Sequence, residues 1–136
     1  MCLSTTDIER KVADEDIIVF KIFRKDNKSL YQKFDYTPFI GKRYDDTAEE
    51  DIKVTVMDPI HYKTTIRVSG GFVHSFSDCS HAKETLIAQK DDAGLYEGVK
   101  LVIRKCIIPK GSEYYYGNFC NEYASKSLII GEIVYE

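Results

Sequence analysis

Apolar and polar side chains alternate along several parts of the chain, and this pattern predicts a β-rich domain. In the segment 16–24, Ile18, Phe20 and Ile22 alternate with Ile17, Val19, Lys21 and Phe23, which is typical of a strand buried largely on both faces. Segments 52–57 and 62–68 alternate more simply, as strands with one buried face do. Further strands or extended pieces are expected at 30–36, 69–76, 99–108, 113–116 and 127–135.

One helix is predicted, over residues 79–90. Ser77 and Asp78 are suitable N-cap residues, and Asp91 to Gly94 is expected to end the helix. Ala82, Leu86 and Ala88 are the candidates for its buried side. Because strands follow one another without alternating helices, the chain is predicted to be an α+β fold, a mostly antiparallel sheet or partly open barrel with one main helix.

The length of 136 residues suits a single domain with its own core. Residues 1–14 lack periodicity and are expected to form an N-terminal arm or a short helical turn, with the α+β domain spanning 15–136. Turns are expected at 26–28, 38–41 and 109–111. The acidic run 45–51 has no mid-loop glycine and no closing glutamate, so it is interpreted as a solvated loop rather than a calcium site.

Composition and charge narrow the functional classes. The net charge is -3 with both signs interspersed, which argues against nucleic acid as the partner. No apolar run approaches the roughly 20 residues of a membrane span, and the acidic start does not look like a secretory signal. A cytoplasmic protein with reduced cysteines is therefore expected. Cys106 and Cys120 either face one another across a hairpin or are small buried side chains.

Met1-Cys2 is the first candidate for chemistry. Removal of Met1 would leave a cysteine with both a thiol and a free α-amine, the combination that N-terminal nucleophile enzymes use. Leu3 follows, where glutamine-using amidotransferases usually have glycine, and no Asn-Gly oxyanion segment is present. The alternative is that Cys2 is simply part of a flexible start.

The segment from His74 to His81 is the second candidate, because it joins two imidazoles, the Cys79 thiol and a carboxylate. Its spacing matches no zinc pattern, so neither a metal nor a cofactor is predicted. Two preceding glycines and the adjacent helix start favour a ligand pocket around His74, Ser75 and Ser77, with His74 as an alternative acid or base. A strand that simply turns into a helix explains the same residues.

Two further patterns involve tyrosine. His61-Tyr62 with Glu113 or Glu132 loosely resembles the His, Tyr and Glu of diphtheria-toxin-type ADP-ribosyltransferases.

The chain also has ten Tyr and no Trp. Tyr115 is a candidate for a ligand-binding residue or an interface anchor, with core packing as the alternative.

Several segments together resemble a group of small uncharacterised proteins from gut bacteria and their phages. The resemblance runs through Met1-Cys2-Leu3, residues 13–21, the Gly-Phe-Val-His-Ser-Phe segment 71–76, and the Lys-Cys-Ile-Ile-Pro-Lys-Gly segment 105–111. It continues through Tyr115, Gly117, 123–125 and 128–130. It implies one complete domain to which these segments all belong, and it implies no activity.

A small binding or interaction module for an unknown protein or small-molecule ligand is therefore the expected function, without nucleic acid or membrane. Self-association into a homo-oligomer is left open. The alternative is a small enzyme that uses Cys2 or His74, and an ADP-ribosyltransferase-like activity is a remote third option. The position of Cys2 relative to His74, Cys79 and Tyr115 would discriminate between these functions.

Overall fold

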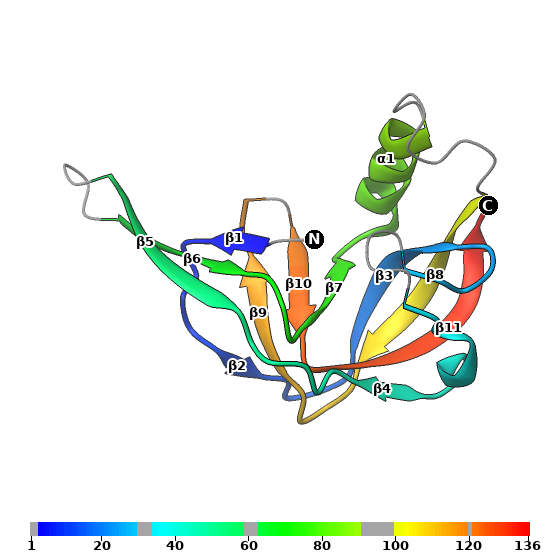
Figure 1. Ribbon diagram of the computed structural model, residues 1–136, viewed down its shortest axis with the longest axis horizontal. Helices are drawn as coiled ribbons and strands as arrows, with labels where there is room; N and C mark the ends of the chain where they lie inside the picture. Colours follow the sequence, from blue (N-terminus) through cyan, green and yellow to red (C-terminus); the bar gives the residue numbers. More distant parts are fainter. Residues whose placement is uncertain (1–2, 30–33, 59–62, 91–99, 120) are drawn as a thin grey trace.

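A computed structural model describes residues 3–29, 34–58, 63–90, 100–119 and 121–136, which form two antiparallel sheets and one α-helix (Figure 1). The predicted α+β class, mostly antiparallel with one main helix, is confirmed. The elements are β1 (Leu3–Thr5), β2 (Lys11–Val12), β3 (Ile17–Arg24), the 3₁₀-helix η1 (Thr37–Phe39), β4 (Arg43–Asp45), β5 (Ile52–Asp58), β6 (Lys63–Val68), β7 (Val73–Phe76), α1 (Cys79–Lys90), β8 (Leu101–Ile108), β9 (Glu113–Gly117), β10 (Glu122–Ser125) and β11 (Ser127–Tyr135).

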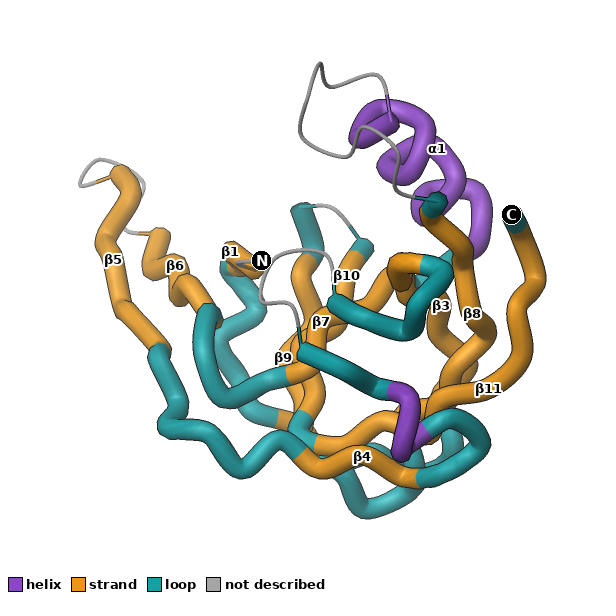
Figure 2. The backbone as a smooth tube through the Cα atoms, turned by 45° about the vertical axis from the view of Figure 1, so that its right-hand side comes forward, coloured by secondary structure: helices purple, strands orange, loops and turns teal. Residues whose placement is uncertain are grey.

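The larger sheet has the strand order β2-β9-β10-β7-β3-β8-β11-β4. Its central pair, β3 with β8, is in register from Ile17↔Ile108 to Arg24↔Leu101, and side chains from both strands are buried in the core. The sheet curves strongly (Figure 2), but within the described residues the sheets are not closed into a barrel. The apolar pattern of segments 16–24 and 99–108 thus identified the strands at the centre of the fold.

The smaller sheet has the order β1-β6-β5, and the β5–β6 pair extends away from the larger sheet (Figure 1). Leu3, Ile66 and Val68 are buried against Phe72 and Tyr115, so one apolar cluster joins the two sheets. This contact places the connection between β6 and β7 next to the larger sheet.

The first 14 residues differ from the expected arm or helical turn. Residues 3–5 form β1, which pairs with β6 through Leu3↔Val68, and residues 11–12 form β2, which pairs with β9 through Lys11↔Tyr114. Strands of three and two residues are too short to show alternation, so their pairing depends on partners far away in the sequence. For the same reason β4 and β10 were not predicted.

The helix α1 begins and is capped as expected. The Asp78 Oδ1 atom accepts a hydrogen bond from the backbone N–H of His81 at 2.7 Å, which is the N-cap contact. Ala82 and Leu86 are fully buried, but Ala88 is exposed. Two residues beyond Leu86, a helical side chain points to nearly the opposite side, so Ala88 cannot share the buried face. The expected end of the helix at 91–94 lies outside the described residues.

The turn at Pro109 to Gly111 ends β8 as predicted, with the Ser112 N–H donating to the Pro109 carbonyl at 3.0 Å. Residues 34–45, by contrast, form no long strand: they include η1 and β4, and β4 is an edge strand that pairs with β11 (Figure 2). The 30–33 part of the strand expected at 30–36 lies outside the described residues. No helix in the described ranges is long and apolar enough to span a membrane.

Candidate functional site

A pocket of about 170 Å³ opens beside strands β3 and β7. These two strands share one registered residue pair, Phe20↔Phe76, and the pocket adjoins it. The remaining walls come from the segments around η1 and β4 and from the connection between β6 and β7. Its aromatic rings are those of Phe34, Tyr36, Tyr44, Phe72 and Phe76, and its polar side chains are those of Lys21, Ser29, Asp46, Glu49, Ser69 and His74.

Lys21 is the cation of this pocket. Alternation along β3 places its side chain on the face that carries Val19 and Phe23, both fully buried. Its Nζ atom donates a hydrogen bond to the His74 carbonyl oxygen at 2.8 Å and lies 5.9 Å from the centre of the Phe23 ring. No carboxylate lies within ion-pair distance of it in the part of the chain that the structure describes. Desolvation of the ammonium group lowers the pKa of Lys21 to about 8.

His74 also lines the pocket and is buried. Its Nε2 atom lies 3.1 Å from the Ser69 carbonyl oxygen, so Nε2 carries the proton and donates. Burial lowers the pKa of the imidazole to about 4, which keeps the ring neutral near pH 7. Its buried Nδ1 atom has no hydrogen-bond partner among the described residues. This nitrogen is therefore a lone-pair acceptor available to a ligand.

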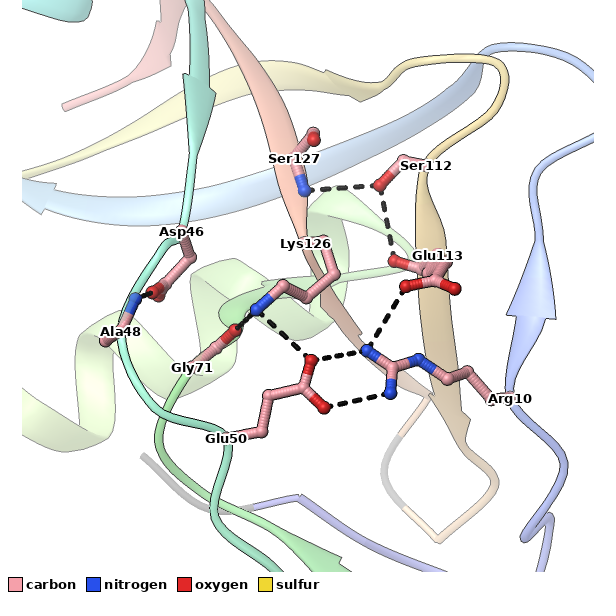
Figure 3. Close-up of polar contacts among 9 residues, drawn as sticks. All are labelled: Arg10, Asp46, Ala48, Glu50, Gly71, Ser112, Glu113, Lys126 and Ser127. Atoms are coloured by element: carbon pink, nitrogen blue, oxygen red, sulfur yellow. Dashed lines mark hydrogen bonds and ion pairs between the residues drawn. The ribbon is translucent and has the colours of Figure 1, made fainter.

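Two carboxylates border the pocket. Asp46 is half-buried, and its Oδ1 atom accepts a hydrogen bond from the Ala48 N–H at 2.9 Å (Figure 3). Glu49 is exposed. The Tyr36 and Tyr44 rings pack edge to face at 5.2 Å, and burial raises the pKa of both phenols. Both hydroxyls are thus protonated at neutral pH, and the pocket offers donors and acceptors between aromatic walls.

The residues predicted to bind a ligand are only partly gathered here. His74 lines the pocket, whereas Ser75, Ser77 and Tyr115 are not among the described residues that line it. Tyr115, Ala124 and His74 lie in one row across β9, β10 and β7, so their side chains share a face of the sheet. Tyr115 is buried and packs edge to face with Phe72 at 5.7 Å.

The two serines have other surroundings. Ser75 is buried on the other face of β7, and its hydroxyl has no hydrogen-bond partner within the described ranges. Ser77 connects β7 to α1, and its backbone N–H donates to the Asn121 carbonyl at 2.9 Å.

The remaining candidates do not assemble into a second site. Cys79 is half-buried, and His81 packs edge to face on Phe76 at 5.0 Å. In the described ranges, no three His, Cys, Asp or Glu side chains are grouped so that they could hold a metal ion. Cys106 is buried, which raises the pKa of its thiol to about 11. Glu132 is exposed. Cys2, Cys120 and His61-Tyr62 lie outside the described residues.

A second group of charges lies close to the pocket, around Glu50 (Figure 3). We call Arg10, Glu50, Glu113 and Lys126 the Glu50 cluster. The Arg10 guanidinium donates to both carboxylate oxygens of Glu50, at 2.9 and 2.5 Å, and lies 3.3 Å from Glu113. Lys126 Nζ lies 3.4 Å from the Glu50 carboxylate and donates to the Gly71 carbonyl at 2.6 Å. The hydrogen bonds from Arg10 hold the pKa of Glu50 below its usual value.

The Glu50 cluster also covers an aromatic ring. Arg10 and Lys126 lie 5.3 and 4.9 Å from the centre of the Phe72 ring, a distance typical of cation–π contacts. Phe72 lines the pocket, as do the neighbours Glu49 and Gly71. The cluster therefore fixes two walls of the pocket to each other, to β9 through Glu113, and to the connection between β10 and β11 through Lys126. The segment 46–51 is a loop that is exposed over most of its length, as expected, but Asp45 lies in β4 and Glu50 is bound by two cations.

Sequence reasoning missed Lys21 and Glu50. A signal for Lys21 was present, because it is the one charged side chain in the otherwise apolar stretch 17–23. Nothing comparable distinguishes Glu50 from its acidic neighbours. Comparisons with protein-family models, with curated proteins and with solved structures found no match to this chain, so the interpretation of the site rests on its geometry.

Proposed function

We propose that this protein is a small-molecule binding module and that the pocket beside Lys21, hereafter the Lys21 pocket, is its binding site. The observation that supports the proposal is the half-buried amine of Lys21, which has no carboxylate partner among the described residues and lies at the wall of an aromatic cavity. A buried charge without a counter-ion costs stability, and such groups are concentrated at functional sites. A ligand that brings a negative group to Lys21 Nζ would compensate this cost.

The dimensions and chemistry of the pocket suggest the class of ligand. A cavity of roughly 150 Å³ accommodates benzene in a known engineered case, so the Lys21 pocket suits one flat ring with a small polar substituent. The ring would pack between Phe34, Tyr44 and Phe72. A carboxylate on it would face Lys21, and a donor could reach the Nδ1 atom of His74. Small aromatic carboxylates are therefore the proposed ligands.

Benzoate and its neutral counterpart benzamide test this proposal. We expect benzoate to bind with an affinity about tenfold higher, because only benzoate compensates the Lys21 charge. Chemical-shift titration of the isotope-labelled protein would measure both affinities and locate the binding site. Equal affinities for the two compounds, or shifts centred away from β3 and β7, would contradict the proposal.

Two variants make the test specific. Lys21→Met retains the length and apolar stem of the side chain but removes the charge, so we expect benzoate affinity to fall by about tenfold. Lys42→Met removes an exposed lysine that does not line the pocket and serves as the matched control. Circular dichroism would show that both variants are folded. Benzoate binding that is unchanged in Lys21→Met would contradict the assigned role of this residue.

The setting of this module is part of the same proposal. Its acidic net charge and the absence of paired-cysteine motifs support a cytoplasmic protein. The resemblance to small proteins of gut bacteria and their phages supports a bacterial or phage origin. Fractionation of the cells that naturally produce this protein would test its cytoplasmic location.

A further inference from the structure

We infer that Lys21 is a carbonyl-reactive amine, and that the Lys21 pocket captures small aldehydes or ketones as a reversible imine on Nζ. This inference rests on the proposed function of the same pocket and extends it from binding an anion to forming a covalent bond. The class of ligand it adds is a small carbonyl compound with an aromatic body.

The environment of the amine supports this chemistry. An imine-forming lysine needs a nitrogen that can lose its proton and that is held within reach of a bound carbonyl group. Lys21 lines the pocket, and its Nζ atom is positioned by the His74 carbonyl at 2.8 Å. Since no described carboxylate pairs with it, nothing holds the proton on nitrogen by ion pairing. A lysine pKa of about 8 leaves a far larger neutral fraction at pH 7.5 than the ordinary value of 10.5 would.

His74 supplies an independent observation. It is buried and lines the same pocket, and the Ser69 carbonyl fixes its neutral ring with the proton on Nε2. The unpartnered Nδ1 atom is therefore an available proton acceptor beside the amine. Such a nitrogen buried without a partner costs stability unless a ligand or a reaction uses it.

The reaction balances without an oxidant or a reductant. The lone pair of neutral Nζ attacks the carbonyl carbon, a C–N bond forms, and the C=O π electrons move to oxygen. A proton passes from nitrogen to that oxygen, with His74 Nδ1 as the carrier, and gives a carbinolamine. The hydroxyl then takes up a proton from solvent and leaves as water, and the nitrogen lone pair forms the C=N bond of an iminium. The iminium returns its N–H proton to solvent and becomes the imine. Amine and carbonyl compound thus yield imine and water, and hydrolysis reverses the sequence.

Other titratable and charged groups surround the amine. Arg104 lies directly opposite Lys21 on β8, and its guanidinium donates to the Gly131 carbonyl at 2.8 Å and to Asn27 at 3.0 Å. The buried Cys106 thiol is on the same strand. On β7 the neighbour is His74, and the remaining wall carries Asp46, Glu49, Tyr36 and Tyr44. None of the described carboxylates forms an ion pair with Lys21, so its deprotonation breaks none.

Reductive trapping with benzaldehyde and sodium cyanoborohydride tests the inference on the full chain. We expect peptide mass spectrometry to show Lys21 modified about tenfold faster than exposed Lys42 near pH 7.5, because far more of its amine is neutral. The rate at Lys21 should rise with pH and level off above a midpoint near the lysine pKa of about 8. Equal modification of the two lysines, or a midpoint near 10, the value of an ordinary lysine, would overturn the inference.

Variants and the benzoate titration separate this inference from the proposed function. Lys21→Met should abolish the selective modification, whereas Lys42→Met should leave it unchanged. His74→Gln should slow trapping at Lys21, because the imidazole carries the proton in this reaction. Benzoate binding without selective trapping overturns the imine and leaves the binding module in place. The absence of both overturns both, and trapping at Lys21 without benzoate binding supports the reactive amine alone.

Discussion

Lys21 and Lys126 make the same backbone contact in two different electrostatic settings. Each donates from Nζ to a carbonyl in the stretch 71–74, Lys126 to Gly71 at 2.6 Å and Lys21 to His74 at 2.8 Å. Lys126 also has the Glu50 carboxylate at 3.4 Å, whereas Lys21 has no carboxylate partner among the described residues. The hydrogen bond to a backbone carbonyl is therefore common to both lysines. They differ in whether a carboxylate compensates the charge of the ammonium group.

This difference gives the two lysines separate roles. The Glu50 cluster holds the loop 46–50 against the connection between β6 and β7, and the Lys126 ammonium group there is paired with Glu50. At Lys21 the same kind of group is desolvated without compensation, which lowers its pKa and favours a neutral, nucleophilic nitrogen. One lysine stabilises the walls of the pocket and the other supplies its chemistry.

The largest expected effect is a loss of stability on substitution of Gly71, whose backbone binds Lys126 and packs against Glu50. Its φ of +84° is left-handed, and a Cβ atom there would lie 2.7 Å from the Glu50 Cα atom. Gly71→Ala should therefore lower the free energy of unfolding by roughly 3 kcal/mol, from left-handed strain together with overpacking against backbone. Urea unfolding of the variant and the wild-type protein would measure this loss.

Gly111→Ala is the matched control for Gly71→Ala. Gly111 has a similar φ of +89°, but nothing lies within 4 Å of its added Cβ atom. Only the left-handed strain of about 1–2 kcal/mol should remain. If the two variants lose equal stability, the close packing of Glu50 against Gly71 contributes nothing, and the proposed fixing of the pocket walls is wrong.

A smaller change in the free energy of unfolding should come from Lys21, the lysine without a carboxylate partner among the described residues, as pH rises. Below pH 8 Lys21 is charged in both the folded and the unfolded protein, and its burial costs stability. Between its folded pKa of about 8 and its ordinary value of 10.5, the folded protein has released this proton while the unfolded chain still holds it. The free energy of unfolding of the wild-type protein should therefore rise by about 2 kcal/mol relative to Lys21→Met between pH 7 and pH 10.

Urea unfolding at both pH values would measure this difference. Both proteins have the same tyrosines, so the effect of tyrosine ionisation on stability cancels when the two are compared. The same comparison with Lys42→Met is the control, because Lys42 is exposed and does not line the pocket. A difference between wild type and Lys21→Met that stays constant across this range would mean that Lys21 keeps an ordinary pKa.

The smallest effect is expected at Glu50 itself. Glu50→Gln retains the shape of the side chain but removes the charge that Arg10 and Lys126 share. Because the group is partly exposed, we expect a loss of only about 0.5–1 kcal/mol in the free energy of unfolding at low salt. The loss should shrink in about 1 M NaCl, where the Debye length is only about 3 Å.

Glu132→Gln is the control for this prediction, because Glu132 is exposed and forms no ion pair in the described part of the chain. Thermal unfolding at two salt concentrations would compare the variants. A loss in Glu50→Gln that is independent of salt would point to packing on Phe72 rather than to charge.

The elements that the sequence predicted well are those whose pattern is long enough to read. Residues 127–135 and 79–90 agree with β11 and α1, and the continuous apolar run in 99–108 identified β8, which begins at Leu101. Strands of two to four residues, such as β1, β2, β4 and β10, were missed because their position depends on a partner strand. The α+β class followed from the long elements alone.

The candidate site was harder to predict, because it depends on which distant segments meet. The two glycines and the helix start pointed to His74, which does line the pocket. Lys21 was not selected, because a lysine within a strand could equally face solvent while the strand's neighbours are unknown. The walls formed by Tyr36 and Tyr44 depend on how 34–45 crosses the larger sheet, and no local pattern specifies that crossing.

The central pairing of β3 with β8 also bears on how the chain folds. Ile17 must meet Ile108, and Leu3 and Lys11 must find Val68 and Tyr114, so most of the sheet joins positions far apart in the sequence. Topologies dominated by such non-local pairs fold slowly, because loop closure precedes the contacts that compensate for it. During synthesis, β3 would leave the ribosome well before β8 exists. The edge of β3 that pairs with β8 would stay open until more than one hundred residues had been translated, and in this interval the chain would be most open to aggregation or to a chaperone.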